Sequence, residues 1–290
     1  MTVSEAQVWT IAAVLKWATD DFRARGIENP RLDAEVLLGR ALGASRTQLV
    51  IDMMKPLAPG ELARFRDMVK RRRAREPVAY ILGEREFFGR AFAVDSRVLI
   101  PRPDTETLVD VALARTRHAS MSARVLDLCT GSGCVAITLA RERPTTGVTG
   151  ADASAGAIAV AEKNALRLGA YNAHFVTCDL YGDLQGEFDL ITANPPYIAA
   201  PEIPGLSPDI VKFEPHLALE GGADGYAITA RIVEGAPAHL ANGGVLAMEV
   251  GAGQAEHVAE LLRARGFVAI ERARDYARIE RVVSGVWEGR

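Results

Sequence analysis

The chain has 290 residues, of which 49% are hydrophobic and 24% are charged, and this composition is typical of globular proteins rather than disordered or fibrous ones. Its net charge of −3 argues against nucleic acid as the main partner, because such domains usually carry a strong basic excess. Three cysteines are too few for a disulfide framework or a four-ligand zinc site. No run approaches membrane-spanning length, and Met1–Phe22 lacks the pattern of a secretory signal. We therefore predict a cytoplasmic protein with neither a membrane nor a stable nucleic-acid partner.

Residues 1–75 are predicted to form a small helical domain. Apolar residues recur at three- and four-residue steps from Val8 to Ala18 and again from Leu62 to Val69, which is the spacing of one helix face. The domain ends in the basic run Lys70–Arg75. We expect this run to be a solvated helix end, since cations are favoured there, with docking onto an acidic or RNA surface as the alternative.

Residues 76–105 are predicted to be a connector that contains a short hairpin around Gly89-Arg90. Residues 106–290 alternate short apolar runs with helical periods, a pattern typical of an α/β domain with a parallel sheet. Five strands are expected near residues 125–128, 147–151, 174–177, 188–192 and 245–250. Two closing strands, 267–270 and 281–286, have no helix-length segment between them and should therefore pair antiparallel.

A glycine-rich turn follows the first strand of this domain. Asp127 to Cys134 contains Thr130, Gly131, Ser132 and Gly133, and glycines at such a turn let backbone amides approach a ligand closely. About twenty residues later, Asp152 ends the second strand, where a carboxylate can accept hydrogen bonds from ribose hydroxyls. Together these features predict an adenosine-type cofactor. They leave an oxidoreductase open, because the dinucleotide fingerprint is also satisfied.

A second motif, Asn194-Pro195-Pro196-Tyr197, directly follows the apolar strand at 188–192. A planar amide or amino nitrogen has a delocalised lone pair, so a site that methylates it must hold both N–H groups. The Asn194 side chain and the Pro195 backbone each offer a carbonyl acceptor, and two prolines restrict motion. Tyr197 can lie against the planar group. This motif favours methyl transfer to a planar nitrogen over hydride transfer, with a side-chain amide or the amino group of adenine in DNA as possible acceptors.

The chain resembles the HemK/PrmC-type protein-glutamine N5-methyltransferases, which act on peptide chain release factors. The matching stretches are Glu76–Gly83, Leu99–Leu108, the Gly131 loop, Asn194–Tyr197, Phe213–Pro215, Gly221–Gly225 and Glu249–Gln254. The resemblance implies a class I S-adenosylmethionine-dependent methyltransferase fold, Rossmann-like with a mostly parallel seven-stranded sheet, and a small N-terminal helical domain that binds substrate. It also implies a release factor as partner, with the glutamine of its Gly-Gly-Gln motif as the methylated residue.

Residue roles also follow from the resemblance. The residues implied to bind S-adenosylmethionine are Thr130, Gly131, Ser132, Gly133, Asp152, Asp179, Leu180 and Asn194. Those implied to bind the glutamine or act in catalysis are Asn194, Pro195, Pro196 and Tyr197. Arg102, Pro103 and Glu214 match segments near the cofactor but receive no chemical step. No metal is expected, and no strong base, because no histidine or carboxylate is expected beside Asn194.

Two departures from the family pattern affect these expectations. Cys129 stands where release-factor enzymes commonly have glycine, and Cys129–Cys134 is instead similar to a sister family that methylates a large-subunit ribosomal protein. That protein is therefore an alternative substrate. Asp275–Arg281 also departs from the usual pattern, and we expect it to affect stability more than catalysis. A DNA adenine methyltransferase and a non-catalytic binding module are weaker alternatives, the latter because neither motif is damaged.

Overall fold

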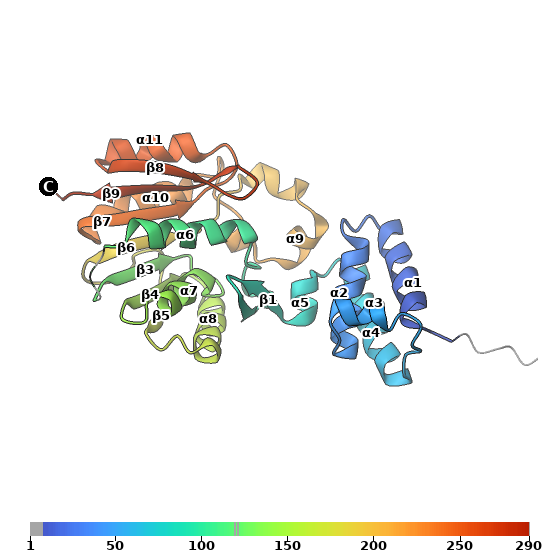
Figure 1. The fold of residues 1–290 in the computed structure, drawn as a ribbon. Helices are drawn as coiled ribbons and strands as arrows, with labels where there is room; N and C mark the ends of the chain where they lie inside the picture. Colours follow the sequence, from blue (N-terminus) through green and yellow to red (C-terminus); the bar gives the residue numbers. More distant parts are fainter. Residues whose placement is uncertain (1–7, 119, 121, 290) are drawn as a thin grey trace, which may run out of the picture. The chain divides into compact units, whose positions relative to one another are not determined.

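The computed structural model describes residues 8–118, 120 and 122–289. The chain divides into two compact units, one up to Gly83 together with Pro208–Phe213, the other Glu84–Ser207 together with Glu214–Arg290 (Figure 1). The first seven residues, which belong to the predicted helical domain and to the segment considered as a secretory signal, lie outside the described residues. The predicted boundaries at residues 75 and 105 stay predictions.

Unit 1 is helical, as its apolar spacing indicated. Its helices are α1 (Ile11–Ala24), α2 (Pro30–Leu42), α3 (Arg46–Ile51), α4 (Pro59–Arg73), α5 (Val78–Leu82) and α9 (Pro208–Phe213). The Thr10 hydroxyl caps α1 by accepting a hydrogen bond from the Ala13 N–H at 3.2 Å. Phe22 and Phe65 are fully buried and belong to one hydrophobic core of this unit. Burial of these apolar helix faces provides the main stabilisation of such a unit.

The basic run Lys70–Arg75 is used inside unit 1. Arg72 is only 5% exposed and forms ion pairs of 2.7 Å with both Asp33 and Asp209. The other arginines of the run pair within the same unit, Arg71 with Glu76, Arg73 with Asp21 and Arg75 with Asp209. The prediction of a solvated helix end is wrong for Arg72. These pairings favour a role in holding the unit together over docking to an outside partner.

Unit 2 is built on a seven-stranded sheet in the order β5-β4-β3-β6-β7-β9-β8. Its strands are β3 (Arg124–Leu128), β4 (Gly147–Asp152), β5 (Ala173–Thr177), β6 (Phe188–Ala193), β7 (Leu240–Glu249), β8 (Val268–Arg274) and β9 (Glu280–Trp287). Strands β3 to β7 are parallel, and β9 lies antiparallel to both β7 and β8. The predicted fold class and the antiparallel closing pair are confirmed. The predicted hairpin is also present, as β1 (Glu84–Phe87) and β2 (Arg90–Ala93).

Helices cover both faces of this sheet (Figure 1). One core contains residues of α6 (Glu106–Arg115), α7 (Cys134–Glu142) and α8 (Ala155–Leu168), and the other contains residues of α10 (Ala227–Gly235) and α11 (Ala255–Arg265). Successive side chains of a strand enter opposite cores: Val125 joins the first and Leu126 the second. None of the helices in the described part of the chain combines the length and apolar composition needed to cross a bilayer.

The strand order reverses between β3 and β6, and this reversal shows where on the sheet a ligand site is expected. Leu128 pairs with Ala151 on β4 and with Ala193 on β6, so the segments that follow these three strands leave the sheet side by side. Ligands of open α/β sheets bind at the carboxyl ends of the strands at such a reversal. The glycine-rich turn, Asp152 and Asn194 are therefore brought to one edge.

Candidate functional site

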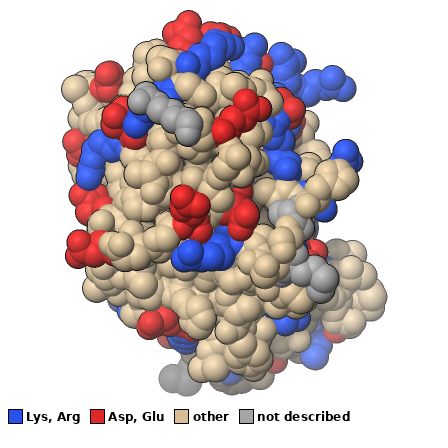
Figure 2. Space-filling model, turned by 90° about the vertical axis from the view of Figure 1, so that its left-hand side faces the viewer, with Lys and Arg blue, Asp and Glu red and all other residues tan. Residues whose placement is uncertain are grey.

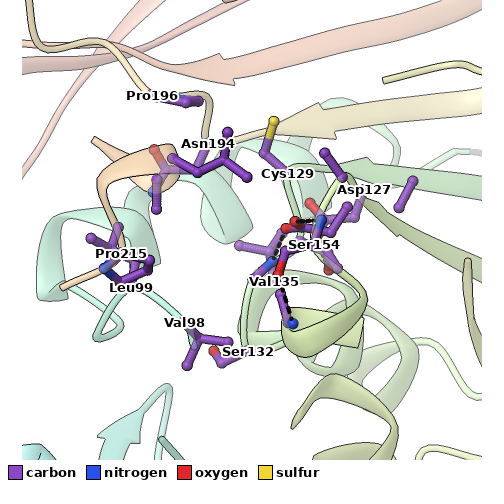
Figure 3. A pocket seen from close by; sticks show the side chains of 18 of the residues that line it. Val98, Leu99, Asp127, Cys129, Ser132, Val135, Ser154, Asn194, Pro196 and Pro215 are labelled. Carbon is purple, nitrogen blue, oxygen red and sulfur yellow. Dashed lines mark hydrogen bonds between the residues drawn. The ribbon is translucent and has the colours of Figure 1, made fainter. Parts of the chain in front are cut away.

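A pocket lies at this carboxyl edge of unit 2 (Figure 3). In the figure, Asn194 and Pro196 stand on one side of the pocket, and Asp127 and Ser154 stand on the other. The residues implied by the resemblance that line it are Thr130, Gly131, Ser132, Asp152, Asp179, Leu180, Asn194 and Pro196. Gly133, Pro195 and Tyr197 are not among the lining residues. The two sequence motifs are therefore brought together around one cavity.

The two glycines of the turn serve different purposes. Gly131 has a φ of +55°, and a Cβ added there would meet nothing within 4 Å, so glycine supplies the left-handed conformation on the open side of the turn. Gly133 begins α7 with a φ of +77°, and an added Cβ would lie 2.9 Å from Ile137 and 3.1 Å from Ala161. Gly133 therefore allows the start of α7 to pack closely against Ala161 on α8.

Asp152 is held by backbone amides at the end of β4. One carboxylate oxygen accepts a hydrogen bond from the Gly131 N–H and the other from the Ser154 N–H, each at 2.9 Å. Burial raises the pKa of Asp152, and the two amide hydrogen bonds lower it in part. A carboxylate has about four lone-pair positions, so this one can still accept hydrogen bonds from a ligand in the pocket.

Asp127 is the more deeply buried carboxyl group of the pocket and was given no role from the sequence. It is 1% exposed and accepts hydrogen bonds from the hydroxyls of Thr130 at 2.6 Å and Thr192 at 2.7 Å. Burial raises its pKa to about 6, against the effect of these two donors. Asp127 thereby ties the glycine-rich turn to β6. Asp127 could have been identified from the sequence, because it stands at the start of the glycine-rich motif and near the end of an apolar strand.

The Asn194–Tyr197 loop contacts two of the other matching stretches, Gly221–Gly225 and Glu249–Gln254. The Tyr197 carbonyl accepts a hydrogen bond from the Gln254 side-chain amide at 2.9 Å. A Cβ added to Gly221 would lie 2.7 Å from the Pro196 carbonyl oxygen, so only glycine fits there. On the pocket side, the Asn194 side-chain N–H donates to the Thr105 hydroxyl at 3.3 Å. The loop is thus held without using the Asn194 side-chain oxygen.

A further carboxyl group, that of Glu249, is buried close to Asn194. Glu249 is 1% exposed, and it follows Met248, which pairs with Ala193, so it leaves the sheet beside Asn194. Burial raises the pKa of Glu249 to about 7 and that of Tyr197 to about 12. The expectation of no carboxylate beside Asn194 is wrong, because the pairing of Ala193 with Met248 places Glu249 next to Asn194 at the edge of the sheet. Asn194 and Glu249 both occur in the matching stretches, but their sequence separation gave no sign that they are neighbours.

Arg102 and Glu214, which had no assigned step, form one ion pair. The Arg102 guanidinium lies 2.6 Å from the Glu214 carboxylate, whose side chain is 2% exposed. The same carboxylate accepts a hydrogen bond from the Ile100 N–H. Arg102 lines the pocket, so this pair places a cation on its wall.

Two thiols, Cys129 and Cys134, also line the pocket. Burial raises the pKa of both, for Cys134 to about 12, so both stay protonated and are poor nucleophiles at neutral pH. Cys129 adopts a φ of +55°, a conformation that favours glycine and costs other residues energy. Glycine would adopt the same conformation without that cost. Among the residues that the structure describes, no cluster of three or more His, Cys, Asp or Glu side chains could hold a metal ion.

Comparison with known proteins assigns the family. Residues 13–83 match the family described as PrmC N-terminal domain, and residues 105–212 match Methyltransferase small domain. A release factor glutamine methyltransferase of Geobacter sulfurreducens is 45% identical, over 96% of this chain and 97% of that protein. The chain belongs to the release factor glutamine methyltransferase family. A second member, from Bordetella pertussis, is 46% identical over 88% of this chain and 94% of its own length.

A solved structure supports the fold. The Thermus thermophilus 16S rRNA N2 G1207 methyltransferase, in complex with S-adenosylmethionine and guanosine, is 20% identical with a TM-score of 0.51, over 71% of this chain and 50% of that one. The family of its relatives shows that the chain is a methyltransferase.

Proposed function

We propose that this protein transfers a methyl group from S-adenosylmethionine to the side-chain nitrogen N5 of a glutamine in the Gly-Gly-Gln motif of a peptide chain release factor. The observation that carries the proposal is the convergence of Asp152 and Asn194 on one pocket, in a chain whose relatives are named for this activity. The first residue suits a ribose, and the second suits a planar amide.

The pocket lining fits the parts of S-adenosylmethionine. Asp152 is the acceptor for the ribose hydroxyls, since backbone amides hold it in place while lone pairs stay available. Leu180 and Cys129 offer apolar surface for the adenine, with Asp179 at the outer edge. The open turn at Thr130, Gly131 and Ser132 borders the methionine part, and the N-terminus of α7 beside it favours a carboxylate. When bound, this cofactor supplies an electrophilic methyl group.

The Asn194–Tyr197 loop holds the nucleophile. The Asn194 side-chain oxygen and the Pro195 carbonyl accept one N–H each from the glutamine amide, and no hydrogen bond within the described chain occupies either oxygen. Fixing both N–H groups sets the direction of the nitrogen lone pair. Such positioning is worth several kcal/mol of barrier in general. Pro196 and Tyr197 confine the loop, so the two acceptors keep their separation.

A methyl-transfer assay tests this proposal. Purified protein and labelled S-adenosylmethionine are incubated with a release factor, with its variant carrying Gln→Ala at the Gly-Gly-Gln tip, and with a ribosomal protein fraction. We expect label on the first substrate alone. Label on a ribosomal protein alone would support the sister-family activity instead, and label on the Gln→Ala variant would show that another residue is the acceptor.

The same assay with duplex DNA tests the adenine alternative. Methylation of a base in a duplex requires a basic surface and extrusion of the base. The face of the molecule in Figure 2 shows acidic and basic side chains interspersed, without one large basic area, and the net charge is −3. We therefore expect no label on DNA.

A further inference from the structure

Asn164 has no assigned role, yet it is fully buried in α8 and its side-chain amide makes three hydrogen bonds. The amide oxygen accepts from the Ala93 N–H at 2.7 Å. The amide nitrogen donates to the carbonyls of Ala93 at 3.0 Å and Ser132 at 2.9 Å. Since a backbone N–H can only donate and a carbonyl can only accept, these partners fix both ends of the amide. Asn164 therefore joins three segments, which are α8, the end of β2 and the glycine-rich turn.

The glycine-rich turn is held at three consecutive residues by three different side chains. These hydrogen bonds join Thr130 to Asp127, Gly131 to Asp152 and Ser132 to Asn164. Asp127 and Asp152 line the pocket, whereas Asn164 does not, so the Ser132 carbonyl is directed into the protein interior rather than into the pocket. A carbonyl oxygen that faced the pocket would repel the carboxylate of the methionine part of the cofactor. The hydrogen bond to Asn164 therefore keeps this oxygen away from the ligand.

The chain that follows Ala93 forms part of the pocket wall. Ala93 is the last residue of β2, and the pocket-lining residues a few positions later are Arg97, Val98, Leu99, Pro101 and Arg102. A second residue of α8, Arg167, donates a hydrogen bond to the Ala91 carbonyl on the same strand. Asn164 and Arg167 are three positions apart and therefore lie on one face of the helix. This face of α8 fixes where β2 ends and where the wall Arg97–Arg102 begins.

We propose that Asn164 is a positioning residue that holds the glycine-rich turn and the wall Arg97–Arg102 in the arrangement that binds S-adenosylmethionine before this cofactor enters. The inference rests on the proposed function, in which that cofactor occupies the pocket. Figure 3 shows Val98 of the wall and Ser132 of the turn on the same side of the pocket. A preformed pocket binds its ligand more tightly, because less conformational freedom is lost on binding. Without Asn164, the turn and the wall would have to be ordered by the cofactor itself.

Asn172 provides a matched control for Asn164. Its side-chain nitrogen donates to three backbone carbonyls, those of Ala140, Arg143 and Thr146. Asn172 directly precedes β5, so it lies at the amino edge of the sheet, opposite the edge that carries the pocket, and it does not line the pocket. Asn164→Leu and Asn172→Leu each replace the amide by an apolar side chain of similar shape. The Kd for S-adenosylmethionine is measured by isothermal titration calorimetry, together with the free energy of unfolding in urea and kcat at saturating cofactor.

We expect Asn164→Leu to raise the Kd for S-adenosylmethionine at least about tenfold, and Asn172→Leu to change it less than about twofold. Both variants should be less stable than wild type, because each leaves backbone carbonyls without their donors. At saturating cofactor, kcat of Asn164→Leu should stay within about threefold of wild type, since Asn194 is untouched. A wild-type Kd in Asn164→Leu would overturn the inference, and so would an equal rise of Kd in the two variants.

Hydrogen exchange in the wild-type protein gives a second test, which applies even if Asn164→Leu does not fold. The backbone amide proton of Ala93 is followed by NMR with and without S-adenosylmethionine, and that of the buried Leu126 on β3 reports the general stabilisation by ligand. We expect the Ala93 amide to be protected without cofactor and to gain no more protection than that of Leu126 when cofactor is added. Protection of Ala93 that arises only with the cofactor would overturn the inference. If the wild-type protein binds no S-adenosylmethionine, or binds it and methylates no release factor, the proposed function fails, while the protection of Ala93 still tests the inference.

Discussion

Replacement of Glu249 by glutamine should change how the stability of the protein depends on pH. Burial raises the pKa of Glu249 from its ordinary value of 4.5 to about 7 in the folded protein. The folded state therefore holds this proton more tightly than the unfolded chain. The stability that the protonated carboxyl contributes is fully present below pH 4.5 and is lost as the pH rises through about 7. Glutamine cannot ionise, so the Glu249→Gln protein does not lose this stability as the pH rises.

The magnitude follows from the difference between the two pKa values. At about 1.4 kcal/mol per pKa unit, the rise corresponds to about 3 kcal/mol of unfolding free energy. We expect the stability of Glu249→Gln relative to wild type to increase by an amount of that order between about pH 5 and about pH 8. Taking the difference between the two proteins cancels the contribution of Asp127, whose pKa burial also raises.

Urea unfolding at several pH values measures this quantity. The matched control is Glu260→Gln, since Glu260 has a side chain 63% exposed on α11 and accounts for the loss of one negative charge. A stability difference between Glu249→Gln and wild type that stays constant with pH would refute the reasoning, and so would one that falls as the pH rises.

Three further variants test the site. Asn194→Ala should lower kcat by about a hundredfold with the cofactor Kd nearly unchanged, because it removes an acceptor for the substrate amide; equal losses in both would contradict its role. Asp152→Asn should weaken cofactor binding by about tenfold in isothermal titration calorimetry while kcat at saturation is retained, since the amide accepts fewer hydrogen bonds from ribose. The free energy of unfolding of Cys129→Gly should exceed that of Cys129→Ala by about 1 kcal/mol, because glycine adopts the φ of +55° without strain. A Cys129→Gly protein less stable than Cys129→Ala would count against strain at this position.

The parts of the fold that could be predicted are those with a local signal. Short apolar runs and intervening helical periods located the strands, and the absence of a helix-length segment before β9 required its antiparallel pairing with β8. Asp152 and Asn194 could be identified because each directly follows an apolar strand, and the carboxyl ends of parallel strands share one edge of the sheet.

The remaining site residues depend on contacts between distant segments. Thr105 and Asn194 are 89 residues apart, and Arg102 and Glu214 are 112 residues apart, so no periodicity indicates either contact. Glu249 looks in the sequence like an ordinary end of a strand. Its raised pKa follows from its burial, which depends on the packing of segments far apart in the chain, such as α6 against β7.

The burial of Arg72 could have been predicted from helical spacing, but the basic run around it indicated an exposed position. It continues the buried spacing of Phe65 and Val69 on α4, three residues after the latter. Helical periodicity therefore indicated a buried position, whereas the basic run around it indicated a solvated one. Burial is possible because Asp33 and Asp209 neutralise the guanidinium.

The central claim is that a release factor glutamine is the methyl acceptor, and mass spectrometry of the reacted release factor tests it most directly. We predict that the tryptic peptide with the Gly-Gly-Gln motif gains the mass of one methyl group, and that fragmentation assigns it to the glutamine side chain. Asn194→Ala protein should produce little of this peptide in the same time. A methyl group on another residue, or an unmodified peptide after full reaction, would contradict the account.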